Sequence, residues 1–364
     1  MQTGESIYVL HDKATSEFRY SPFFALAMSG LSRFSEDNAD TIWYLINFFL
    51  LIASFVYLNK LIIRAKLKFS QMFLLYFILL AITNRTILHT FDCGQANILM
   101  LASIIIGLYY ISQKQEIKGG FILALSIMIK YTPLIFIAYF LIKRRFKVAL
   151  IIAAALFTYY LLPSLFIGHK TNLNYVKDSI SFLTQSTILD KGTIYDYDNQ
   201  SLLSAVCRFT THRRPDFMPF YKSFNLSDAG ANQAFAILAL AIFILVFYRP
   251  VKTSANQAID IIDWAQLSIC VVLFNLNAWH HNYVLLIMAY FIIIYYLIRA
   301  NFKDTAILTL LIISFLLSLF TIKGFISKSF SHRADFYSPH VFSALLAFFA
   351  LHKLKLNPRN KILQ

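Results

Sequence analysis

The stretch Tyr283-Val-Leu-Leu-Ile-Met-Ala-Tyr-Phe-Ile-Ile-Ile-Tyr-Tyr-Leu-Ile298 decides the fold class. It contains no charged residue, and it lacks the polar face that a surface helix of a soluble protein carries. Ile261–Ala278 and Thr305–Ile322 lack such a face as well. Over all 364 residues the apolar content is 58% and the charged content only 14%. The sequence therefore predicts an all-α integral membrane protein with many crossings.

The basic residues are concentrated in short linkers between the apolar stretches, and the formal net charge is +15. Lys and Arg beside membrane helices mark the cytoplasmic side, so this distribution orients the chain in the bilayer. It predicts no nucleic-acid partner. The cytoplasmic linkers are Lys60–Lys68, Lys143–Lys147, Arg249–Lys252, Arg299–Lys303 and the tail from Lys353 onward.

The apolar stretch Gly119–Ile142 lies between two linkers with cytoplasmic character, Gln113–Lys118 and Lys143–Lys147. This predicts that the chain crosses outward and returns, as a hairpin of two short helices that turns at Lys130-Tyr131-Thr132-Pro133. A lysine facing lipid is costly, which favours a wet cavity at the tip of the hairpin. The alternative is one kinked spanning helix from which the Lys130 ammonium reaches the interface.

The sequence predicts a single membrane domain, with about eleven membrane segments and one long external loop. A connection as long as this loop is more often functional than a simple tether. The expected parts are an external segment (1–40) with an interfacial helix over Phe23–Phe34, a membrane module (41–168), the external loop (169–230), C-terminal membrane helices (231–352) and a cytoplasmic tail (353–364).

Three polar islands interrupt the apolar stretches, namely Asp92–Asn97, Tyr195–Ser201 and Trp279–Asn282. The orientation given by the basic linkers places all three on the non-cytoplasmic face, which indicates a site at that surface. Neither the three cysteines nor the adjacent pair His280 and His281 has the spacing of a zinc site. The alternation of Tyr and Asp in the second island does not fix ligand geometry either. The sequence therefore predicts no metal and no cofactor.

These islands resemble the motifs of glycosyltransferase family 87, whose members have the GT-C membrane fold and use polyprenyl-phosphate sugars as donors. The resemblance covers most of the chain, and it implies a GT-C-like arrangement with seven crossings before the long external loop, the fifth and sixth of them short. It rests on Gly94-Gln95-Ala96-Asn97, on Gly119-Gly120 through Lys130-Tyr131-Thr132-Pro133, on Lys143-Arg144-Arg145, on Asn199-Gln200-Ser201-Leu202 with Arg208, and on Trp279-His280-His281-Asn282 before an apolar helix.

The chain departs from the family pattern at two places. After alignment on Trp279, His281 takes the place of the family's first histidine, so that His280 is an additional residue. The family also begins with a membrane helix followed by an acidic residue, and the position of Met1 corresponds to a point after both. The chain thus resembles a family member that lacks the first helix. Nearby substitutes for the missing carboxylate are Glu5, Asp12 and Glu17.

The chemistry of sugar transfer and the resemblance together suggest roles for individual residues. An acceptor hydroxyl must lose its proton as it attacks, and the charge of the leaving phosphate must be stabilised. We expect His281 and Asp92 to be catalytic, and Arg208 and Lys130 to bind the donor phosphate. Contacts with the sugar or the acceptor are expected from Gln95, Asn97, Tyr195, Asp198, Asn199, Gln200, Trp279 and His280.

Several of these residues have a structural alternative. His281 beside Trp279 is also typical of the aromatic belt at a membrane interface. Arg208, close to Arg213 and Arg214, can belong to a solvated basic group. Gln95 and Asn97 can hydrogen-bond neighbouring helices instead of a sugar.

The sequence thus predicts an inverting membrane glycosyltransferase that moves a sugar, with mannose as the first candidate, from a polyprenyl-phosphate donor to a glycan or glycolipid acceptor. We expect it in a bacterial inner membrane, in contact with lipids, with its site facing the periplasm or exterior. Two alternatives stay open, a transporter or flippase of lipid-linked sugars and an inactive, truncated accessory protein. Inverted repeats would favour the transporter, and the sequence shows none.

Overall fold

The computed structural model describes residues 7–8, 18, 20–63, 67–189, 194–211, 224–248, 257–319 and 328–356. These residues form helices, and the β-type pairing among them is the isolated bridge between Thr211 and Leu226, which confirms the all-α class. The 3-10 helices are η1 (Leu31–Arg33), η2 (Thr132–Leu134) and η3 (His280–Leu286). The α-helices are α1 (Pro22–Met28), α2 (Glu36–Ile62), α3 (Phe69–Asp92), α4 (Asn97–Ser112), α5 (Glu116–Ile129), α6 (Ile135–Ile142), α7 (Phe146–Leu161), α8 (Ser164–Ile167), α9 (His169–Leu189), α11 (Leu202–Thr210), α12 (Asp228–Phe247), α13 (Gln257–Leu273), α14 (Ile287–Arg299), α15 (Thr305–Leu319), α16 (Lys328–Phe336) and α17 (Pro339–Leu356).

Five helices in the described part of the chain are long and apolar enough to cross a membrane. A sixth span results if α16 and α17, which meet at an angle of 54°, are counted as one broken span. The five are α2, α3, the continuous segment Phe146–Ile167, α12 and the segment His280–Arg299. These helices support a polytopic membrane protein, and the larger total of about eleven segments stays a prediction.

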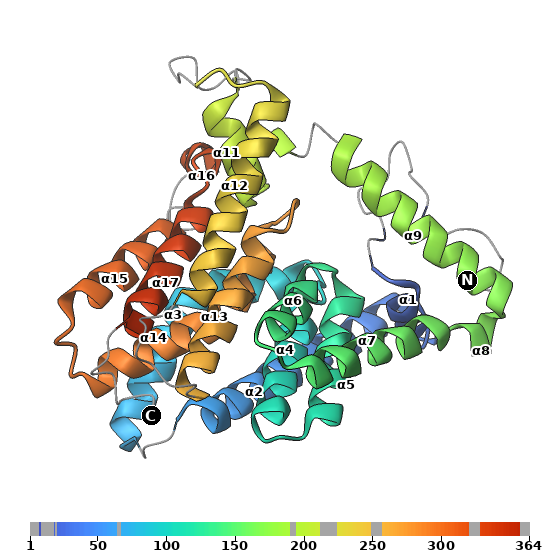
Figure 1. Cartoon of the computed structure of the whole chain (residues 1–364), viewed down its shortest axis with the longest axis horizontal. Coiled ribbons are helices and arrows are strands. Elements are labelled where there is room, and N and C mark those ends of the chain that lie inside the picture. The colour runs from blue at the N-terminus through green and yellow to red at the C-terminus, as the bar shows by residue number, and fades with distance from the viewer. Residues whose placement is uncertain are drawn as a thin grey trace. The chain divides into compact units, whose positions relative to one another are not determined.

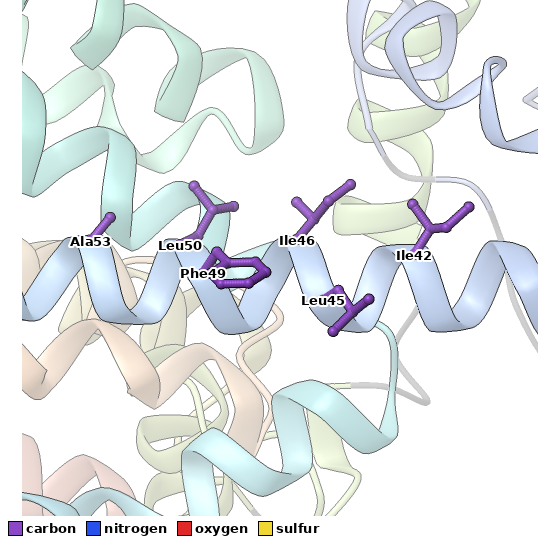
Figure 2. Close-up of a pocket in the computed structure, with 6 residues that line it drawn as sticks. All are labelled: Ile42, Leu45, Ile46, Phe49, Leu50 and Ala53. Carbon is purple, nitrogen blue, oxygen red and sulfur yellow. The ribbon is translucent and has the colours of Figure 1, made fainter.

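Large apolar side chains cover the outer surfaces of several of these helices. Phe49 on α2 is 63% exposed, Leu150 on α7 71% and Ile237 on α12 68%. A soluble protein would expose such surfaces to water at a high cost, whereas lipid tails solvate them. Figure 2 shows the apolar groove along α2, lined by Ile42, Leu45, Ile46, Phe49, Leu50 and Ala53. These six side chains offer no polar group for catalysis, so the groove is not a candidate catalytic site.

The chain folds into two compact units. The first comprises residues 1–54 and 98–190, and the second comprises residues 55–97 and 191–364. In the second unit, α14 is the central helix and contacts α3, α13, α15 and α17 (Figure 1). Because these neighbours surround it, every residue from His280 to Ile298 is buried. The Tyr283–Ile298 stretch, apolar on every side, is therefore the core of this unit.

The first unit contains the break in helical structure that the sequence predicts at Lys130. Helix α5 ends at Ile129, Lys130 has extended backbone angles (φ −142°, ψ 141°), and η2 begins at Thr132 and leads into α6. Pro133 stands in the first turn of η2, where a missing N–H costs nothing. The two short helices are thus confirmed, and their path across the membrane stays a prediction.

The connection 169–230 is not an irregular loop throughout. It contains the 21-residue helix α9 and the shorter α11. Ser201 caps α11, because its hydroxyl accepts a hydrogen bond from the Ser204 N–H at 3.0 Å. The interfacial helix expected over Phe23–Phe34 corresponds to α1 and η1, and Ser21 caps α1 in the same way. The polar and apolar residues of α9 do not form a strong stripe, which is why the sequence predicted only a loop after residue 168.

Gly119 allows α4 and α5 to approach each other closely. A Cβ atom at this position would lie 2.6 Å from the backbone oxygen of Gly107 and 2.7 Å from the backbone nitrogen of Ile111. Small residues permit such backbone contact between membrane helices. We expect Gly119→Val to destabilise the protein by about 1–3 kcal/mol, because backbone atoms cannot move aside as a side chain can. Thermal unfolding in detergent measures this effect.

The matched control is Gly30→Ala. The nearest atom to an added Cβ there, the Ala27 carbonyl oxygen, lies 3.9 Å away. The melting temperature of this variant should equal that of the wild type. Equal melting temperatures for Gly119→Val and the wild type would contradict the close approach of the two helices.

Candidate functional site

The three polar islands meet within the second unit. The hydroxyl of Thr90, near the end of α3, donates to the backbone oxygen of His281 at 3.2 Å. The Ala278 N–H donates to the Asn199 side-chain oxygen at 3.2 Å, and the Gln200 N–H donates to the Ala278 carbonyl at 2.6 Å. Segments that are 79 to 191 residues apart in sequence therefore form one cluster of polar side chains. Their position on one face of a membrane, which the sequence predicts, stays a prediction.

His281 lies in a stack of aromatic rings. Its ring is nearly parallel to that of His89 on α3, with centroids 5.5 Å apart and an interplanar angle of 10°. The Trp279 ring lies on the His281 ring at 6.4 Å and 28°. His281 is buried, whereas Trp279 is 37% exposed and marks the edge of the cluster. An exposed indole face of this kind can bind the apolar face of a sugar ring.

His280 points into a different group of side chains. Its Nε2 lies 3.7 Å from Asp335 Oδ1 and 4.0 Å from Asp198 Oδ1. The ring of His340, at the start of α17, contacts it with centroids 4.7 Å apart, and the ring of His89 lies at 5.7 Å. His280, Asp335 and His340 are buried, whereas Asp198 is partly exposed. The cluster thus combines imidazoles and carboxylates in a setting with little water, where charges interact strongly.

Arg85 lies one helical turn before His89 on α3, so both side chains project from the same face of that helix. Its guanidinium is within electrostatic reach of Asp335 and Asp198. Its Nε is buried and makes no hydrogen bond with a described residue. This arginine is therefore a positive charge inside the cluster.

Arg208 is also buried, but its terminal nitrogens are engaged within the protein. Nη1 donates to the Asp196 carbonyl oxygen, and Nη2 donates to the Asn199 carbonyl at 2.9 Å and to Ser338 Oγ at 2.6 Å. Burial lowers the pKa of Arg208 to about 10, and the negative charges of Asp196 and Asp335 oppose this shift. Arg208 therefore stays charged at neutral pH and joins the Asp196–Asn199 turn to the junction of α16 and α17.

Asn199 and Gln200 hold two loops together. The Asn199 amide nitrogen donates to the Leu276 carbonyl at 3.3 Å, and its oxygen also accepts from the Ser201 N–H. The Gln200 amide nitrogen donates to the carbonyls of Tyr197 (2.7 Å) and Asp335 (2.8 Å). These bonds fix the position of the second island, and contacts of either residue with a sugar stay a prediction.

The other predicted contact residues lie around this cluster. The Tyr195 hydroxyl donates to Asp228 Oδ1 at 3.0 Å. Asp92 is exposed at the end of α3, Gln95 is half-buried, and Asn97 is fully buried at the start of α4. The ring of Tyr197 stacks on His332 at 4.7 Å, and burial together with the charge of Asp198 raises the pKa of Tyr197.

Two groups of predicted residues lie elsewhere. Lys130 belongs to the first unit and is half-buried. Its role in phosphate binding stays a prediction. The candidate substitutes for the family's acidic residue, Glu5, Asp12 and Glu17, lie outside the described residues.

Sequence reasoning missed four members of the cluster: Arg85, His89, Asp335 and His340. The first two carried a usable signal, because a charged residue and a histidine at i and i+4 of an apolar helix form one polar stripe. Asp335 and His340 carried none, because they flank a helix break without a recognisable motif.

The structure also contains two groups of side chains with the spacing of metal ligands. One consists of Asp198, His280 and Asp335, and the other of His89, Cys93 and His281. In each group, one potential ligand atom per residue lies within 4.8 Å of the others. The expectation of no metal came from sequence spacing, which does not show these contacts.

A comparison with protein-family models gives a match to glycosyltransferase family 87 over residues 18–276. This match covers more than two thirds of the chain, including Arg85, His89, Asp198 and Arg208. No curated protein and no solved structure matches the chain significantly. The family match agrees with the apolar helices and with the sequence motifs described above. The chain belongs to glycosyltransferase family 87.

Proposed function

We propose that this protein transfers a sugar, with mannose as the first candidate, from a polyprenyl-phosphate donor to a glycan or glycolipid acceptor on the non-cytoplasmic face of the membrane. The main support is a cluster of charged and imidazole side chains, in which His280, His281 and Asp335 are buried and Arg85, His89 and Asp198 are half-buried, found in a chain that belongs to a glycosyltransferase family. Direct displacement by the acceptor hydroxyl would invert the anomeric carbon.

The first chemical requirement is a base for the acceptor hydroxyl. Histidine is the side chain whose ordinary pKa is nearest neutrality, which makes it an effective general base. The His281 ring contacts the ring of His89 and that of Trp279, which is partly exposed. Asp92 is exposed close by, at the end of the helix that carries His89. We assign proton removal to His281, with Asp92 positioned to orient the acceptor.

The second requirement is a positive charge for the phosphate that leaves. Arg208 donates hydrogen bonds to two backbone carbonyls and a serine, so its guanidinium has a structural role within the protein. Arg85 lies in the same cluster; the buried Nε of each arginine lacks a hydrogen-bond partner among the described residues, so the two differ in the terminal nitrogens, which Arg208 commits to the protein. Arginine binds phosphate oxygens through paired N–H groups. We therefore assign the phosphate contact to Arg85 and a positioning role to Arg208.

The proposal is tested by sugar transfer from a radiolabelled polyprenyl-phosphate mannose, with purified protein in lipid nanodiscs. Arg85→Met should reduce kcat/KM by about 10²–10³-fold, because it removes one preorganised positive group from the transition state. Arg85→Lys should recover part of the activity, since it restores the charge without the paired N–H groups.

Arg299→Met is the control, because Arg299 is exposed at the far end of α14 from the histidines. It should transfer sugar at the wild-type rate. If the wild-type protein transfers no sugar from any polyprenyl-phosphate donor, yet moves labelled lipid between the leaflets of proteoliposomes, the proposed function is wrong and the protein is a flippase.

A further inference from the structure

Asp198, His280 and Asp335 form a compact group at the junction of three segments. Asp198 belongs to the turn before α11, His280 begins η3, and Asp335 lies near the end of α16. The distances from His280 Nε2 to Asp335 Oδ1 and Asp198 Oδ1 are 3.7 and 4.0 Å, and the ligand atoms all lie within 4.8 Å of one another. These side chains come from distant parts of the sequence, so no linear motif shows them.

The imidazole ring of His280 is buried, and among the described residues it lacks the hydrogen bonds that its two nitrogens would make in water. The residue is 3% exposed, and neither ring nitrogen makes a hydrogen bond with any described residue. A buried polar group without such a partner costs about 1–3 kcal/mol. The Nε2 atom faces the two carboxylates, and Asp198, whose side chain is 26% exposed, leaves access from one side. A bound cation would satisfy the ring nitrogen and both carboxylates together.

We propose that Asp198, His280 and Asp335 bind one divalent transition-metal ion, with Zn²⁺ as the first candidate. Zinc accepts imidazole nitrogen and carboxylate oxygen at about 2.0–2.2 Å, and three protein ligands leave a fourth position for another molecule. Tetrahedral coordination with bonds of that length places neighbouring ligand atoms about 3.4 Å apart. The separations of 3.7 and 4.0 Å from His280 would need to shrink by a few tenths of an ångström, and that between the two carboxylates, which is at most 4.8 Å, by up to about 1.4 Å.

The charges around the group fit an anionic ligand at the fourth position. The carboxylates of Asp196, Asp198 and Asp335 interact with the guanidinium groups of Arg85 and Arg208. A divalent cation changes the net charge of these five groups from one negative to one positive. The phosphate diester of a lipid-linked sugar carries one negative charge and would complement it. This role of the metal rests on the proposed function, whereas the metal site itself does not.

The second group, His89, Cys93 and His281, is the competing location. Cys93 Sγ lies 3.8 and 3.9 Å from the two ring nitrogens of His89, and Cys93 is exposed. His280 and Asp335, by contrast, are buried, and neither ring nitrogen of His280 has a hydrogen-bond partner among the described residues. We therefore favour the carboxylate group, and the thiol provides a way to distinguish the two sites.

The test uses the purified full chain in nanodiscs, treated with a chelator and dialysed against Zn²⁺. We expect one tightly bound Zn²⁺ per wild-type chain, and loss of that ion in His280→Gln and Asp335→Asn. Cys93→Ser should keep it. Co²⁺ bound in its place should give ligand-field absorption without a thiolate charge-transfer band. Circular dichroism and gel filtration check that each variant folds. If a substitution at a buried position prevents folding, Asp198→Asn, at the partly exposed position, replaces it and should also lose the ion.

Unchanged zinc content in these variants, or no bound metal in the wild type, would overturn the proposal. A thiolate band that disappears in Cys93→Ser would place the metal in the competing group instead. Because metal content is measured without a sugar donor, the two hypotheses can fail separately. Zinc binding without any sugar transfer would refute the proposed function and leave the metal site intact.

Discussion

His281→Ala is expected to slow sugar transfer by about 10²–10⁴-fold, the usual contribution of a general base. The effect should appear in kcat, since a base acts on the reacting hydroxyl and not on the binding of the donor. Single-turnover transfer from a radiolabelled polyprenyl-phosphate mannose measures it. The acid limb of the pH profile of kcat should disappear as well, because that limb reports protonation of the base.

A purely structural role for His281 makes a different prediction. The His281 ring contacts the rings of both His89 and Trp279, so removal of the ring also disturbs packing. His281→Phe keeps an aromatic ring in the stack but has no titratable nitrogen. A catalytic role predicts that His281→Phe is as inactive as His281→Ala although it is more stable. Recovery of activity in His281→Phe would show that the ring serves packing alone.

The matched control is another histidine, His169. It lies at the start of α9 in the first unit and is exposed. His169→Ala should show wild-type rates and the wild-type pH profile. Equal losses of transfer activity in the His169 and His281 variants would show that the losses come from poor folding of the purified variants and not from a missing base.

The sequence identified the polar islands but not the contacts between their side chains. Polar islands in an apolar chain are conspicuous, because the bilayer penalises every unsatisfied polar group, and the islands containing Cys93, Asp198 and His281 lie close together in the structure. What the sequence could not supply was the pairing of individual side chains. Asp335 reaches His280 because α16 and α17 meet at a sharp bend, and no local pattern encodes that contact.

For Arg208, too, the sequence identified the position of the residue but not its contacts. Its position after Asn199-Gln200-Ser201 suggested a phosphate ligand, but a sequence position does not show which acceptors surround a guanidinium. In the structure, the carbonyls of Asp196 and Asn199 and the Ser338 hydroxyl accept its hydrogen bonds. Arg85 was missed by the sequence analysis, although its distance of four residues from His89 gave a usable signal.

The hydrophobic pattern of the sequence was sufficient to predict some helices and breaks of the fold but not others. The break at Lys130 followed from basic linkers and a proline, which act through local physics. The helix α9 was missed because its polar and apolar residues do not form a strong stripe. The number of crossings cannot be read from the length of apolar stretches alone. Helix α14 is apolar because protein surrounds it, whereas α12 is apolar although most of its residues lie at the outer surface of the protein.

Asp263→Asn is expected to destabilise the protein by about 3–5 kcal/mol, because it leaves the charged Lys355 ammonium buried without its anionic partner. Lys355 Nζ lies 2.7 Å from Asp263 Oδ1, and both side chains are 0% exposed. The ammonium also donates to the Val246 carbonyl oxygen, so the pair connects α13, α17 and the end of α12. The free energy of unfolding in mixed micelles, measured by denaturant titration, provides the test.

Two further variants show whether the loss comes from the isolated charge. Lys353 lies on the same helix and pairs with Asp304 at 3.4 Å, but its side chain is 48% exposed. Lys353→Met should therefore cost at most about 1 kcal/mol, as exposed pairs do. The double variant Asp263→Leu with Lys355→Met removes both charges and should recover most of the stability lost in Asp263→Asn. A double variant no more stable than Asp263→Asn would show that the pair itself, and not the avoidance of a lone buried charge, stabilises this junction.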